Sequence, residues 1–127
     1  MRGLPILLAS VLFAIAGCAS IPADAPSSGA HQADAQRRAE IRLQLASAYF
    51  AEGQYATALA ELDQAYLTGQ RRADVLGLRA LVLMQQGDAT AATRSLKQAL
   101  QTEPDHPGLL NNMGWLLCET GHYEEGQ

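Results

Sequence analysis

The sequence predicts an all-α fold, a solenoid of antiparallel helix pairs. The 23 Ala and 19 Leu residues make up a third of the 127-residue chain, whereas Val, Ile and Thr together number 13. Helix formers therefore dominate over β-branched residues. No proline stands between Pro26 and Pro104. Three glycines, Gly53, Gly87 and Gly121, lie 34 residues apart, and a fixed period of this length indicates repeated helix pairs.

Other positions keep the same period. Alanine recurs at 58 and 92 and at 65 and 99, and leucine recurs at 62 and 96. Within each set the spacing is i, i+4, i+7, which gives a helix one apolar stripe. This pattern resembles the tetratricopeptide repeat, with repeats at 39–72, 73–106 and 107–127, the third incomplete. The helices are expected at 35–52, 55–68, 73–86, 89–101 and 107–120. Arg42 and Arg79 stand where this repeat usually has apolar residues.

Composition and motifs argue against several functions. A chain of this length forms one small domain, and its net charge of −4 gives no basic surface for nucleic acid. It has no nucleophile paired with a base and no glycine-rich phosphate loop, so we expect no enzyme, no cofactor and no small-molecule substrate. His106 and His122 lack a metal-ligand spacing. Cys118 stands among apolar residues, so we expect it to be buried, the alternative being a reactive thiol.

The amino-terminal segment is typical of an export signal. Residues 1–17 join Arg2 to a short apolar run, which ends in small residues directly before Cys18. This junction resembles the bacterial lipobox, which implies that Cys18 is lipidated; the alternative is an ordinary secreted chain. Ala19 after the cysteine favours the periplasmic face of the outer membrane of a Gram-negative bacterium. Residues 18–38 would hold the lipidated cysteine and a tether leading into the first helix, with 19–33 as a flexible spacer.

The segment 110–126, LNNMGWLLCETGHYEEG, carries a more specific resemblance. It resembles the motif of the type IV pilus biogenesis and stability lipoproteins, the pilotins. Asn111, Asn112, Gly114, Trp115, Leu117 and Cys118 match that motif, whereas Met113 and Gly126 depart from it. The resemblance implies a lipid-anchored adaptor that assists assembly of an outer-membrane secretin. The alternatives are a scaffold for other envelope proteins, such as peptidoglycan enzymes, and an enzyme with its catalytic part beyond residue 127.

The tetratricopeptide resemblance also implies where a partner binds. In that fold the first helix of each pair lines a concave surface. The residues that we expect in this protein-binding groove are Leu43, Ser47, Phe50, Leu81, Met84, Asn111 and Trp115. Trp115, Leu81 and Met84 should form one apolar strip, and the ligand should be an apolar or helical segment. The alternative for Trp115 is a packing role in the core between repeats.

The end of the chain carries one further expectation. Gln127 falls four residues into the second helix of the third repeat. A solenoid needs about three repeats and a polar capping helix to bury its apolar faces. The sequence therefore suggests the amino-terminal fragment of a longer protein.

Overall fold

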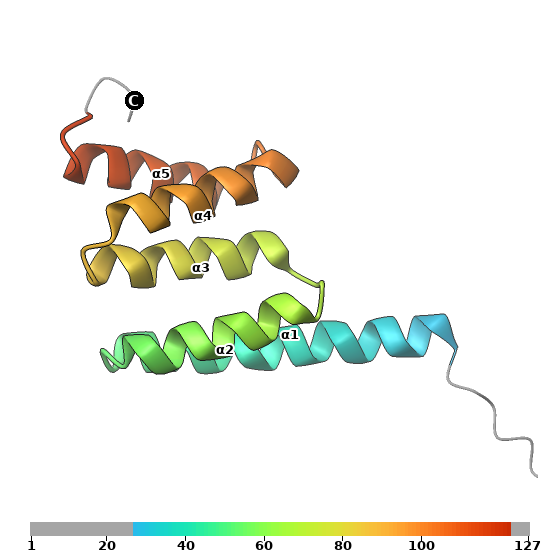
Figure 1. Cartoon of the computed structure of the whole chain (residues 1–127). Helices are drawn as coiled ribbons and strands as arrows, with labels where there is room; N and C mark the ends of the chain where they lie inside the picture. Colours follow the sequence, from blue (N-terminus) through green and yellow to red (C-terminus); the bar gives the residue numbers. More distant parts are fainter. Residues whose placement is uncertain (1–26, 123–127) are drawn as a thin grey trace, which may run out of the picture.

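The computed structural model describes residues 27–122, and these residues form a stack of helices (Figure 1). The helices are α1 (Ser28–Ala51), α2 (Tyr55–Leu67), α3 (Arg72–Gln85), α4 (Ala89–Thr102) and α5 (Pro107–Glu119). Helices α1 and α2 pack together as one antiparallel pair and α3 and α4 as the next, while α5 lies on the second pair. The described residues contain no strand. The predicted all-α solenoid of helix pairs is confirmed.

The core is built from the residues that repeat with the period of 34. Ala58, Leu62 and Ala65 have no exposed surface, and neither have their equivalents Ala92, Leu96 and Ala99. Ala46 and Ala80, on the first helix of each pair, are also fully buried. Small side chains at these points let the two helix backbones of a pair approach closely, and the leucines fill the space beside them.

The repeated glycines mark where each first helix ends. Gly53, Gly87 and Gly121 have φ angles of 72°, 80° and 81°, in the left-handed region that glycine adopts without steric cost. After Gly87, the Asp88 side chain accepts a hydrogen bond from the amide N of Ala91 at 2.9 Å and so caps α4. The glycine period therefore reflects one turn geometry used three times.

The two arginines at usually apolar positions are accommodated by carboxylates on α2. The Arg42 guanidinium on α1 donates to Glu61 Oε2 at 2.6 Å. Arg79 on α3 pairs with Asp63. Both pairs connect neighbouring helices, and both arginine side chains keep contact with solvent. The Arg42 side chain remains 42% exposed at the edge of the helix contact, whereas Arg79 is more enclosed and its Nε atom is buried without a hydrogen-bond partner.

Helix α1 begins seven residues before the expected start at 35, so the prediction of a flexible spacer was wrong for residues 28–33. The Ser27 hydroxyl accepts a hydrogen bond from the amide N of Ala30 at 3.3 Å and caps the helix. Beyond this cap the chain is rich in Ala, Gln and Arg, which favour a helix. Within residues 27–122, none of the helices has the length and apolarity needed to cross a membrane. The signal segment, Cys18 and the rest of the spacer lie outside the described residues.

Candidate protein-binding groove

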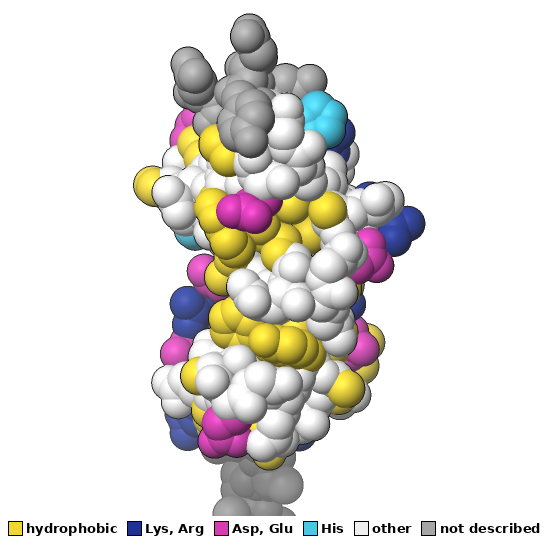
Figure 2. Space-filling model, turned by 90° about the vertical axis from the view of Figure 1, so that its left-hand side faces the viewer, with side chains coloured by type: hydrophobic (Ala, Val, Ile, Leu, Met, Phe, Trp, Pro, Cys, Tyr) yellow, Lys and Arg dark blue, Asp and Glu magenta, His cyan; other side chains and the backbone are white. Residues whose placement is uncertain are grey.

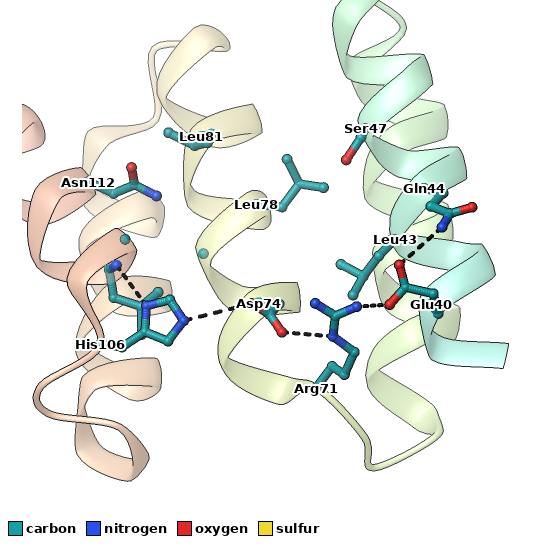
Figure 3. Close-up of a pocket in the computed structure, with 13 residues that line it drawn as sticks. Glu40, Leu43, Gln44, Ser47, Arg71, Asp74, Leu78, Leu81, His106 and Asn112 are labelled. Atoms are coloured by element: carbon teal, nitrogen blue, oxygen red, sulfur yellow. Dashed lines mark hydrogen bonds and ion pairs between the residues drawn. The ribbon is translucent and has the colours of Figure 1, made fainter. Parts of the chain in front are cut away.

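The first helices of the pairs form the inner layer of the stack. Helix α3 packs against both α1 and α5, whereas α2 and α4 are joined by a hydrogen bond that Gln98 Nε2 donates to Tyr66 Oη at 2.9 Å. A cavity of about 490 Å³ runs across α1, α3 and α5, and we call it the central groove (Figure 3). Its lining residues are Glu40, Leu43, Gln44, Ser47, Arg71, Asp74, Gly77, Leu78, Leu81, His106, Gly108, Leu109 and Asn112.

The floor of the central groove is apolar and depends on a glycine. Leu43 and Leu109 are buried, while Leu78 and Leu81 are partly exposed toward the cavity. A Cβ atom added at Gly77 would lie 2.9 Å from Leu109 Cδ2, which is too close for van der Waals contact. Glycine at this position therefore lets α5 approach α3 and close the floor.

A connected series of charged side chains lies at one end of the central groove. Arg71 Nε donates to Asp74 Oδ2 at 2.9 Å, and its Nη1 pairs with Glu40 on α1 (Figure 3). Arg71 stands at the amino-terminal cap of α3 with φ 48° and ψ 36°. This left-handed conformation is uncommon for a residue other than glycine. The two carboxylates hold the guanidinium across the gap between α1 and α3, which is consistent with the unusual backbone.

His106 connects this series of charged side chains to α5. Its Nδ1 accepts a hydrogen bond from the amide N of Leu109 at 3.3 Å, so the imidazole is the amino-terminal cap of α5. Its Nε2 faces Asp74 Oδ1 at 3.8 Å. Because Nδ1 accepts, this arrangement places the ring proton on Nε2, toward the carboxylate. Sequence reasoning considered His106 only as a metal ligand; its place directly before Pro107 was the signal for a cap.

We expect His106→Ala to lower the free energy of unfolding by about 1 kcal/mol, the usual cost of losing a side-chain cap. His106→Asn should recover most of that loss, because Asn is among the best capping residues. Urea unfolding followed by circular dichroism measures both variants. Equal stability of His106→Ala and the unsubstituted chain would contradict the capping role.

The predicted groove residues are divided between two cavities. Leu43, Ser47 and Leu81 line the central groove. Met84 and Trp115 line a second cavity of about 310 Å³, between the ends of α3 and α5, which we call the tryptophan pocket. Its other lining residues are Gln85, Gly87, Ala89, Leu116, Glu119 and Thr120. Leu81 thus lies in the central groove and Met84 and Trp115 in the tryptophan pocket, so the single apolar strip expected for these residues is divided between the two cavities.

Phe50 and Asn111, the other predicted groove residues, line neither of these two cavities. The Phe50 ring packs against the Tyr55 ring, with 6.0 Å between centroids, and is partly buried beside the core of the first pair. Asn111 is exposed and lines neither cavity. Trp115 is 42% exposed, so its indole is available at the surface.

Comparison with known proteins agrees with this geometry. Residues 83–127 match the tetratricopeptide-repeat family. The fold is a tetratricopeptide-repeat solenoid. No curated protein and no solved structure matches the chain. The presence of this repeat supports binding of a protein partner.

The prediction that Cys118 is buried was wrong. Its thiol is free and exposed, not buried. The buried residues of α5 are Leu109 and Leu116, seven positions apart on one stripe. Two residues beyond Leu116 the helix has turned by about 200°, so Cys118 points away from the core. Apolar sequence neighbours were a poor guide because consecutive helical residues face different directions.

Proposed function

We propose that this chain is a lipid-anchored adaptor that binds a segment of a protein partner in its concave inner layer. The observation that carries the proposal is the central groove, in which three first helices surround a cavity with an apolar floor. An apolar floor with polar groups at one end suits a peptide segment that presents apolar side chains. The adaptor would have no chemistry of its own.

We further propose that the adaptor is a pilotin and that its partner is a secretin subunit. The support is the resemblance of segment 110–126 together with where its residues lie. Asn112 lines the central groove and Trp115 lines the tryptophan pocket. These two motif residues therefore border the two cavities proposed for binding. A binding role explains why a large aromatic side chain is left 42% exposed.

Deleting the gene for the full-length protein should reduce assembled secretin multimers and surface pili. Heat-resistant multimers are measured by immunoblot of membrane fractions. The intact gene should restore them, and so should Leu67→Ala, which changes an exposed leucine on α2 outside both cavities. Normal multimers in the deletion strain would contradict the pilotin role and favour a scaffold for other envelope proteins.

Cys18→Ser should release the protein from the membrane, because the lipobox-like junction supplies the thiol that carries the lipid. Several acyl chains on one cysteine anchor a protein firmly, at about 0.8 kcal/mol per buried methylene. Palmitate labelling and membrane fractionation measure the effect. Cys118→Ser is the matched control and should leave labelling intact. Unchanged labelling of Cys18→Ser would contradict the anchor.

A further inference from the structure

The tryptophan pocket lies where two helices end. Helix α3 ends at Gln85 and α5 ends at Glu119, and both residues line the pocket. Figure 2 views the molecule from the side of these helix ends and of the turn between α3 and α4. Hydrophobic side chains form bands across this face, with acidic side chains beside them and basic side chains at the edges of the view. Met84, Trp115 and Leu116 supply the apolar wall of the pocket.

The electrostatics of this pocket favour a cation. Among the described residues that line it, Glu119 alone carries a charge. The last turns of α3 and α5 contain no basic residue, and each helix end carries a partial negative charge of about half an elementary charge. The amino terminus of α4, which begins at Ala89 in the same pocket, offsets one of these two partial charges and is itself capped by the Asp88 carboxylate. The Trp115 indole is 42% exposed, and a Lys or Arg placed over an indole ring is attracted to it.

The positive charge in the central groove is already paired with carboxylates, so it does not offset the negative charge of the tryptophan pocket. This positive charge is the guanidinium of Arg71, which pairs with both Glu40 and Asp74. The Asp, Glu, Lys and Arg side chains that line the two cavities are thus three carboxylates and one guanidinium. An acidic segment would be repelled along this surface.

We propose that the tryptophan pocket selects partner segments in which an apolar side chain stands beside a Lys or Arg. The apolar side chain packs on Met84 and Trp115, and the cation meets Glu119 and the ends of α3 and α5. This inference rests on the proposed adaptor function and names the chemistry of its ligand.

Selection from a display library of random dodecapeptides tests this proposal. The full chain, purified in mild detergent, is the bait, and binders to Trp115→Ala are removed. Enriched peptides should combine Leu, Met or Phe with neighbouring Lys or Arg. Because Trp115 is the chain's one tryptophan, tryptophan-free synthetic versions should change its fluorescence as they bind.

Variants of the pocket separate the apolar contact with Trp115 from the charge contact with Glu119. By fluorescence anisotropy of labelled peptide, Trp115→Ala should weaken binding about 30-fold. Glu119→Gln should weaken it about two- to fivefold, and less at high salt. Leu67→Ala should have no effect. Acidic or purely apolar enriched peptides, or affinity unchanged by Glu119→Gln, would overturn the cation preference while leaving the adaptor standing. Failure to enrich any peptide sensitive to Trp115→Ala would overturn both.

Discussion

Leu96→Ala should lower the free energy of unfolding by about 2–5 kcal/mol, the range for emptying a fully buried leucine site. Leu96 has no exposed surface and packs in the cluster that joins α3, α4 and α5. The neighbouring core residues Ala92 and Ala99 are too small to fill the resulting cavity. Chemical denaturation followed by circular dichroism measures the loss.

Leu67→Ala is the matched control for this change, because it removes the same atoms from a side chain that is 77% exposed. Its effect should stay within about 0.5 kcal/mol, as is usual for surface substitutions. If Leu96→Ala cost no more than Leu67→Ala, the helix pairs could not share the core described above.

Trp115→Ala should weaken binding of the partner by about 2 kcal/mol or more, roughly 30-fold in affinity. The melting temperature should stay close to that of the unsubstituted chain, because the indole is 42% exposed and lies on the wall of a pocket. Partner affinity and melting temperature are measured on the same full-length variant. Trp115→Phe should keep part of the affinity, since it retains an aromatic surface.

If Trp115 packs in the core instead, Trp115→Ala should lower the melting temperature and leave partner affinity unchanged. Emptying a large buried site costs about 3–5 kcal/mol and would lower the melting temperature strongly. Such a drop, with unchanged affinity in the folded fraction, would contradict the binding role.

The fold could be predicted from the sequence because the same local constraints occur in each repeat. Gly53 and Gly87 both have a positive φ, 72° and 80°, and Leu62 and Leu96 are both completely buried. Helix period and turn chemistry are local properties, so they can be read from spacing alone. The start of α1 was misplaced because the serine cap at Ser27 stands among turn-forming residues that resemble a linker.

The groove could be predicted only in part. Equivalent repeat positions identified Leu81 and Trp115 as residues of the inner layer, and both line cavities. The contact of Arg71 with Glu40 joins the start of α3 to α1, and sequence spacing carries no record of such side-chain geometry. The contact of Arg71 with Asp74, three residues away, is local to the start of α3. Both carboxylates pair with Arg71, the one Lys or Arg among the described residues that line the central groove.

Site-specific photo-crosslinking in living cells tests most directly whether the inner layer binds the partner. A photoreactive amino acid is placed at Ser47, in the central groove, or at Arg94, an exposed residue on α4 in the outer layer. The adaptor function predicts a crosslinked protein partner from position 47 that is absent from position 94. Crosslinking from position 94 alone would contradict it.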